Sequence, residues 1–273
     1  MSFTSATVRL PVLVPGDEPA EFRYFDSQPA GAPGPAPKTT IIGVHGVCFD
    51  SAFMKYAIEK LGIEPTDKKT KTGGILLLGW SKGCIPPIAL MSSMPHVQNP
   101  LFPMPSEVSS LQPMLESYLR AILLYEPPGT AAGRAPTKDA EELAVDAAEV
   151  PGVFYKWVVK KISPDSLPAL NRAWHGEHAA HEFSWLLAPD RPAIEQVAYQ
   201  AFAPVPPSLG VGLMLGSEAS DYCKDVGDWI QARLAHQAHT AAELIPGAGH
   251  FAMLTHPDAF TKSVLDIVQK LDV

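Results

Sequence analysis

One serine in this sequence stands in a setting that suits nucleophilic chemistry. Ser81 is the centre of the pentapeptide 79–83 (GWSKG), which follows the apolar run 75–78 and precedes a helix-like run over 85–94. A G-x-S-x-G between a strand and a helix is typical of a nucleophile elbow, a tight turn that exposes the hydroxyl at the carboxyl edge of a sheet. The alternative is a glycine-bounded turn that carries an ordinary surface serine.

A serine hydroxyl needs a base to take its proton, and that base is usually a histidine held by a carboxylate. Of the nine histidines, His250 stands out because it lies in the glycine-rich turn 247–251, after the last predicted strand and before an apolar helix. The expected chain order of nucleophile, acid and histidine favours His250 as the general base. The alternative is a hydrogen-bonded loop histidine.

Three carboxylates are candidates for the acid. Glu126 follows the apolar run 122–125 and precedes two prolines, whereas Glu218 and Asp221 lie in the loop after the penultimate predicted strand. A carboxylate at a buried strand end must find partners, because its desolvation is costly. We take Glu126 as the first choice. Asp221 and Glu218 stay open, because a triad is recognised by its geometry and not by chain position.

Backbone N–H groups are needed to hold the oxyanion that forms in acyl transfer. We expect one from Lys82, the residue after the nucleophile, and one from Val47, in the loop after an earlier strand. Trp80, Cys48 and Trp174 are candidates for lining the substrate pocket, with packing in the core as the alternative for each.

Composition narrows the class of protein. The 273 residues are 46% apolar and 18% charged, which suits a globular domain with a sizeable core. A net charge of −8 without a large basic cluster argues against nucleic acid. Three cysteines without a C-x-x-C motif argue against a disulfide framework and structural zinc.

Neither a signal peptide nor a membrane span is evident in the sequence. Three histidines at helical spacing (His175, His178 and His181) have no cysteine or carboxylate cluster beside them, so we interpret them as a solvated helix face. We therefore expect a soluble cytoplasmic protein with a small-molecule partner and with neither a metal nor a cofactor. Its oligomeric state stays open, a homodimer included.

The apolar pattern predicts strands that alternate with helices. Strands are expected at 5–14, 20–26, 39–44, 75–78, 122–125, 211–215 and 243–246, and helices at 50–62, 85–94, 114–121, 137–149, 151–162, 164–174, 190–202, 220–235 and 257–271. The first two strands would form a hairpin, and the others a mostly parallel sheet with helices on both faces. The region 129–204 would be an inserted helical cap on a core formed by 1–128 and 205–273.

Four features occur in a familiar order: a strand ending at His45-Gly46, the pentapeptide around Ser81, an acid, and the turn that carries His250. In this they resemble the α/β-hydrolase superfamily. The resemblance covers the predicted core over 39–95, 114–128 and 209–272. It implies a doubly covered α/β sheet and a Ser-His-carboxylate triad that cleaves an ester or lactone through an acyl-enzyme.

A narrower resemblance concerns the acid. The segments 71–81 and 124–128 are similar to fungal members of the superfamily, and an acid at the position of Glu126 resembles the zearalenone-type lactonases. This implies Glu126 as the triad acid and favours an ester or lactone substrate.

The chain also departs from the family between Gly46 and Gly74. Residues 47–73 have room for one helix and loops, so one strand–helix unit that the family carries there is expected to be absent. Its loss would let the N-terminal hairpin pair elsewhere or would interrupt the sheet. A catalytically impaired or purely ligand-binding protein is therefore one alternative function, and a cofactorless lyase on the same fold is another.

Overall fold

The computed structural model describes residues 4–9, 21–26, 40–44, 75–94, 119–134, 149–174, 191–203, 205 and 209–271. No helix within these ranges is both long and apolar enough to cross a membrane. Several predictions lie outside the described residues, namely the helix 50–62, most of the helix 137–149, the three histidines at helical spacing, and the site residues Val47 and Cys48.

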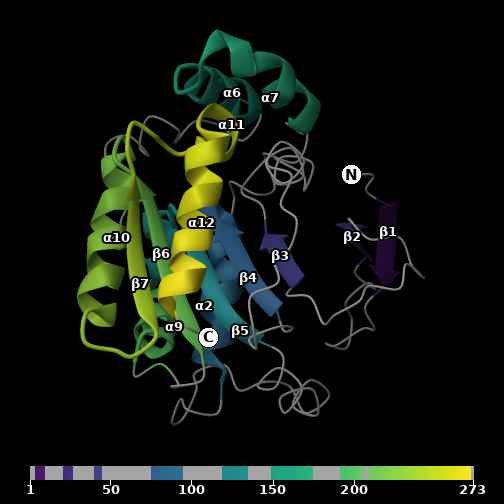
Figure 1. Cartoon of the computed structure of the whole chain (residues 1–273). Helices are drawn as coiled ribbons and strands as arrows, with labels where there is room; N and C mark the ends of the chain where they lie inside the picture. The colour runs from purple at the N-terminus through teal and green to yellow at the C-terminus, as the bar shows by residue number, and fades with distance from the viewer. Residues whose placement is uncertain are drawn as a thin grey trace.

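Within the described residues, five parallel strands form the central sheet, in the order β3-β4-β5-β6-β7 (Figure 1). They are β3 (Thr40–Val44), β4 (Ile75–Trp80), β5 (Leu119–Tyr125), β6 (Gly210–Gly216) and β7 (Thr240–Ile245). Strands buried on both faces are apolar throughout, as β5 and β6 are. Because the strands are parallel, their carboxyl ends meet at one edge, and Ser81, Glu126 and the turn of His250 all follow such ends.

Helices cover both faces of this sheet, which confirms the predicted fold class (Figure 1). One core lies between the sheet and α12 (Pro257–Leu271), and it extends to α6 (Val150–Val159) and α7 (Leu167–Ala173). The opposite core is formed by α2 (Ile85–Ser92), α9 (Arg191–Ala201) and α10 (Asp221–Leu234). Successive strand residues point to opposite cores, as Leu123 and Leu124 of β5 do.

Short helices complete the described elements: η1 (Ser81–Cys84), η2 (Gly129–Ala132), η3 (Pro164–Ser166) and α11 (Ala252–Thr255). Figure 1 shows α6 and α7 above the end of the sheet at which α11 lies. By contrast, α9 packs against α2 beside the sheet. The division of the chain into a core and a cap over 129–204 remains a prediction.

One predicted helix is wrong in part. Residues 114–121 were expected to be helical, but β5 already begins at Leu119. The segment 119–125 is buried between β4 and β6 and pairs with both, so its backbone N–H and C=O groups are satisfied by neighbouring strands. Local helix propensity is a weak preference that such tertiary pairing overrides.

The N-terminal hairpin forms a sheet of its own. The strands β1 (Thr4–Arg9) and β2 (Glu21–Asp26) pair antiparallel with each other, and among the strands of the described ranges β3 pairs only with β4. Within the described ranges the hairpin therefore does not pair with the five-stranded sheet. The expected absence of a strand–helix unit concerns residues 47–73, which lie outside the described residues.

Candidate active site

Ser81 lies directly after β4, at the first residue of a helical stretch formed by η1 and α2. Its φ is 56°, in the left-handed region, which costs a non-glycine residue about 1–2 kcal/mol. A Cβ on Gly79 would lie 2.6 Å from the carbonyl oxygen of Gly83, so strand and helix approach this closely only because position 79 is glycine. The turn brings the serine hydroxyl to the carboxyl edge of the sheet.

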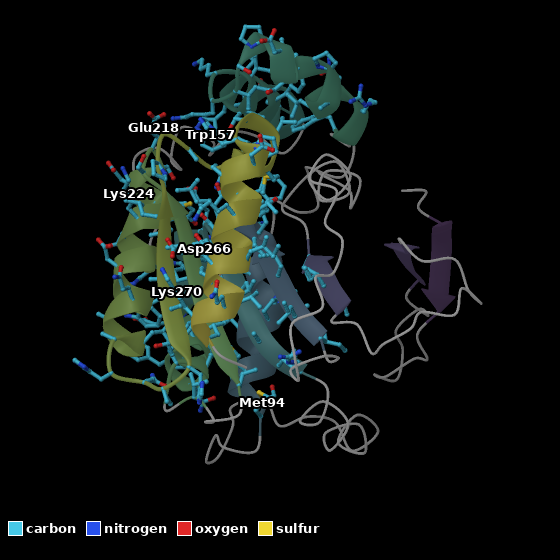
Figure 2. All side chains as sticks on the ribbon, in the orientation of Figure 1. Met94, Trp157, Glu218, Lys224, Asp266 and Lys270 are labelled. Atoms are coloured by element: carbon cyan, nitrogen blue, oxygen red, sulfur yellow. The ribbon has the colours of Figure 1, made fainter. Side chains whose placement is uncertain are left out.

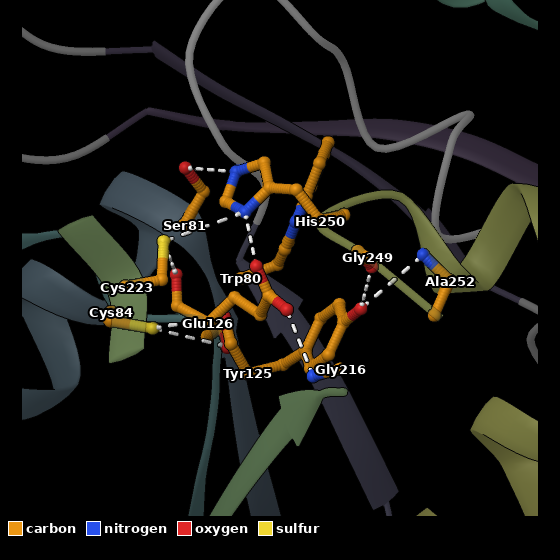
Figure 3. A network of polar contacts seen from close by, with 11 residues as sticks. Trp80, Ser81, Cys84, Tyr125, Glu126, Gly216, Cys223, Gly249, His250 and Ala252 are labelled. Carbon is orange, nitrogen blue, oxygen red and sulfur yellow. Dashed lines mark hydrogen bonds and ion pairs between the residues drawn. The ribbon is translucent and has the colours of Figure 1, made fainter. Parts of the chain in front are cut away.

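Three side chains form a continuous chain of hydrogen bonds at this edge (Figure 3). The Ser81 hydroxyl lies 2.9 Å from His250 Nε2, and His250 Nδ1 lies 2.9 Å from Glu126 Oε2. An ionised carboxylate can only accept, so the imidazole proton belongs on Nδ1. Nε2 is then the acceptor for the serine hydroxyl, which is the tautomer that a general base needs.

Glu126 reaches His250 from a second left-handed turn. Glu126 directly follows the last residue of β5 and has a φ of 45°, and its side chain is fully buried. Burial of a carboxylate is costly unless both oxygens find donors. Here Oε1 accepts the backbone N–H of Gly216 at 2.9 Å and Oε2 accepts from His250, so the buried carboxylate is satisfied on both sides.

The other two candidate acids lie elsewhere. Asp221 is the exposed first residue of α10, and Glu218 is exposed in the loop after β6 (Figure 2). The backbone N–H of Glu218 bonds to the carbonyl of Ala248 at 2.8 Å, which ties this loop to the turn of His250. The loop thus supports the histidine through its backbone, while the carboxylate on Nδ1 comes from β5.

Two cysteines lie beside this chain of bonds. Cys223 Sγ lies 3.8 Å from His250 Nδ1 and 3.7 Å from the carbonyl oxygen of Glu126, and Cys84 Sγ lies 3.3 Å from the carbonyl of Gly79. Burial raises the pKa of both thiols well above the ordinary value, and the charge of Glu126 adds to the effect. Both cysteines therefore stay protonated and pack as small buried residues.

Glu126, Cys223 and His250 also bring three atoms that could bind a metal within 4.8 Å of one another. The carboxylate and the imidazole are hydrogen-bonded to each other, and the raised pKa of the thiol opposes the thiolate that a metal requires. The donor set fits a hydrogen-bonded network better than a metal site.

Cys223 and Gly216 also lie at the site and were not predicted from the sequence. A Cβ on Gly216 would lie 2.1 Å from the carbonyl oxygen of Ala248 and 3.0 Å from Glu126 Oε1, so this glycine lets β6 approach both the acid and the histidine turn. A glycine that ends an apolar strand just before a predicted functional loop is a signal that could have found it. Cys223 has no comparable signal, because its place depends on the orientation of α10.

The remaining predicted site residues have different surroundings. Lys82 follows the nucleophile in η1. The backbone N–H groups in the first turn of a helix point out of its N-terminal end. Trp80 is only 1% exposed and lies against His250, with 5.6 Å between ring centroids, so its surface is covered by packing. Trp174 is half-buried at the end of α7 and packs against Phe154 and Tyr155.

An aromatic residue of α6 lies over the histidine turn. The ring of Trp157 is 6.4 Å from those of both His250 and Phe251, and it stacks on Phe154 at 5.7 Å. Figure 2 shows Trp157 at the end of the molecule at which Glu218 also lies. The site is therefore bordered by an apolar, aromatic surface on the side of α6.

A family comparison and structural comparisons agree with this architecture. The sequence model of a family described as "Alpha/beta hydrolase family" matches residues 12–262. No curated protein sequence matches the chain significantly.

Among solved structures, a haloalkane dehalogenase from Bradyrhizobium elkani is 13% identical, with a TM-score of 0.59 over 98% of this chain and 99% of that one. A peroxisomal alpha-beta-hydrolase from Saccharomyces cerevisiae is 11% identical, with a TM-score of 0.57 over 98% and 89%. A carboxylesterase from Bacillus subtilis is 14% identical, with a TM-score of 0.53 over 97% and 92%. At such identities the likeness concerns the fold, and different activities share it.

Proposed function

The chain belongs to the alpha/beta hydrolase family, and from this premise we propose that it is a serine hydrolase that cleaves carboxylic esters or lactones. The observation that carries the proposal is the chain of two 2.9 Å hydrogen bonds from Ser81 Oγ through His250 to Glu126. A serine, a histidine and a buried carboxylate in this geometry can activate the serine as a nucleophile.

In the first half of the reaction the acyl group moves to the enzyme. Ser81 Oγ attacks the carbonyl carbon while His250 Nε2 takes the hydroxyl proton, and Glu126 stabilises the imidazolium that forms. The tetrahedral intermediate then expels the alkoxide part of the ester or lactone, which receives the proton from Nε2. An ester releases an alcohol at this stage, whereas a lactone opens and stays attached through its acyl end.

In the second half, water takes the place of the alcohol. His250 Nε2 removes a proton from a water molecule, the resulting hydroxide attacks the acyl carbon, and Ser81 leaves with the proton returned by His250. The products are a carboxylic acid and the free enzyme.

The negative charge on the carbonyl oxygen needs fixed donors in both halves. We assign one to the backbone N–H of Lys82, at the start of the helical stretch that follows the nucleophile. The second is assigned to Val47, which lies outside the described residues. Removal of one such donor typically costs about 10²–10³ in kcat.

Two observations bear on the substrate. The aromatic surface of Trp157 beside His250 favours an apolar substrate next to the reacting carbonyl. The lactone part of the proposal rests on the resemblance of the Glu126 position to zearalenone-type lactonases.

Hydrolysis of p-nitrophenyl butyrate and of a δ-lactone by the wild-type protein and by Ser81→Ala tests the proposal. We expect both substrates to be cleaved by the wild type, with kcat at least about 10³-fold lower in the variant. Equal rates in the two proteins, or no cleavage by folded wild type, would contradict it.

The short segment 47–73 favours one alternative, a catalytically impaired or ligand-binding protein. β1 and β2 form a sheet separate from the one that carries the site. Such a protein would bind an ester-like ligand without turnover. Calorimetric binding of a non-hydrolysable phosphonate together with no release of p-nitrophenol by folded wild type would favour this alternative.

A further inference from the structure

The residues just before Ser81 and Glu126 share one position in the sheet. Trp80 ends β4, Tyr125 ends β5, and the two are paired partners in the parallel register. Their side chains therefore point to the same face, and both belong to the core that contains Phe251. In each case the next residue turns into the left-handed region and offers its side chain to His250.

Trp80 holds the backbone of the histidine itself. Its indole Nε1–H donates to the carbonyl oxygen of His250 at 2.9 Å. The indole is 1% exposed, and its ring packs edge-on against Phe251 with 5.6 Å between centroids. The donor side of this hydrogen bond is therefore shielded from competing water.

Tyr125 holds the same turn on the other side of the histidine. Its hydroxyl donates to the carbonyl of Gly249 at 2.5 Å and accepts the backbone N–H of Ala252 at 3.3 Å. Burial, and then the charge of Glu126, raise the pKa of the phenol well above its ordinary value, so the hydroxyl keeps its proton and remains a donor. The two bonds bridge the residues on either side of His250.

We propose that Trp80 and Tyr125 are a pair of positioning residues that fix the His250 turn against the two strands from which Ser81 and Glu126 come. This inference rests on the proposed function. The last residue of each strand thus holds the backbone of the histidine turn, and the residue that follows it bonds to the imidazole. Trp80 and Tyr125, which hold the backbone of the His250 turn, are the direct chain neighbours of Ser81 and Glu126, which bond to the imidazole. The ring is therefore kept in line with both of its partners.

Loss of an anchor should affect turnover more than binding. A misplacement of about 1 Å in a catalytic group can cost about 10²-fold in rate, and a change confined to the transition state lowers kcat while KM stays nearly constant. We therefore expect Tyr125→Phe, which removes only the hydroxyl, to lower kcat by about 10- to 100-fold with KM changed by less than about twofold.

Trp80 is tested by two replacements. Trp80→Phe removes the N–H but also leaves a cavity, whereas β-(3-benzothienyl)alanine at position 80 keeps the bicyclic ring and removes only the donor. Both should lower kcat to the same degree as Tyr125→Phe. Because the anchors hold one turn, the double variant with Tyr125→Phe should lose less than the product of the two single losses.

Matched controls remove similar groups away from the histidine turn. Tyr222→Phe removes a hydroxyl that accepts the backbone N–H of Thr130 at 2.8 Å, and Trp229→Phe removes an indole that packs against Arg233. Both variants should keep wild-type kcat on p-nitrophenyl butyrate. Equal kcat in the Trp80 and Tyr125 variants and in these controls would overturn the proposal.

A second readout does not depend on ester cleavage. The His250 Nδ1–H that bonds to Glu126 should give a far-downfield proton NMR signal in the wild type. In the Trp80 and Tyr125 variants it should broaden by exchange with water, while the two controls keep it sharp. If the wild type cleaves no ester, the proposed function fails, but this signal still decides the positioning role. A signal that stays as sharp in the Trp80 and Tyr125 variants as in the wild type would contradict that role.

Discussion

A carboxylate buried at a strand end persists only if its oxygens find donors, and Glu126 has one on each side. The N–H of Gly216 comes from β6, and the imidazole N–H comes from the turn after β7. Glu126 thereby links three strands of the sheet at one point. Glu218 and Asp221, which are closer to His250 in sequence, are exposed to solvent and have no such environment.

At the residue scale the sharpest prediction concerns the acid. Glu126→Gln keeps the size of the side chain, but an amide must place its NH₂ against one of two N–H donors. We expect kcat to fall by about 10²- to 10⁴-fold, while Asp221→Asn and Glu218→Gln stay within about twofold of wild type. Steady-state kinetics on p-nitrophenyl butyrate measure kcat for the three variants and so test the assignment of the acid. A severe loss in Asp221→Asn together with an active Glu126→Gln would reverse the assignment.

The sequence could place Ser81 and His250 because glycine-rich turns mark their positions. It left the acid open among three residues, because chain order does not give distances at the carboxyl edge. The left-handed φ of Glu126 carries no glycine or asparagine signal. The anchoring bonds of Trp80 and Tyr125 depend on strand register, which the apolar runs 75–78 and 122–125 do not specify.

At the element scale the close approach of β6 to the histidine turn can be tested through one glycine. In Gly216→Ala the new methyl would meet the backbone of Ala248 and crowd Glu126 Oε1, so strand and turn must separate. We expect a loss of about 1–3 kcal/mol in the free energy of unfolding and a lower kcat. Chemical denaturation and ester hydrolysis measure the two effects.

Gly152 of α6 is the matched control, because a Cβ there meets no atom within 4 Å. Gly152→Ala should be neutral or stabilise the protein by up to about 1 kcal/mol, since alanine is the better helix former. If Gly216→Ala were as stable and as active as Gly152→Ala, the tight packing of β6 against the turn would be refuted.

Element types could be predicted well wherever the apolar pattern is strong. The strands at β4, β6 and β7 and the helices α6, α10 and α12 occur where expected, with boundaries shifted by a few residues. The start of β5 was missed because Leu119 to Ala121 suit a helix as well as a strand, and only pairing with β4 and β6 decides between them.

At the scale of the whole molecule, buried titratable groups make the free energy of unfolding depend on pH. Burial raises the pKa of Tyr222 to about 12, and those of Cys84, Cys223 and Tyr125 are also raised. In each case the folded state retains a proton that the unfolded state loses at lower pH. Their contribution to stability is therefore complete below the unfolded pKa and declines as pH rises above it.

The thiols should titrate first, because an unfolded cysteine has a pKa of about 8.5 and an unfolded tyrosine about 10. Above about pH 8.5 each buried thiol should lower the free energy of unfolding by about 1.4 kcal/mol per pH unit. Urea unfolding at several pH values between neutrality and pH 10 measures the slope, and Cys84→Ala with Cys223→Ala should flatten it. A slope that does not differ between the two proteins would contradict the prediction.

The central claim is that Ser81 is a nucleophile activated by His250 and Glu126. Labelling with a fluorophosphonate, followed by mass mapping of the modified peptide, tests it most directly because this reagent needs an activated serine and no particular substrate. We expect wild-type protein to be modified at Ser81, Glu126→Gln to react much more slowly, and Ser81→Ala not to react. Folded wild type that stays unmodified, or that is modified to the same extent as Ser81→Ala, would contradict the claim.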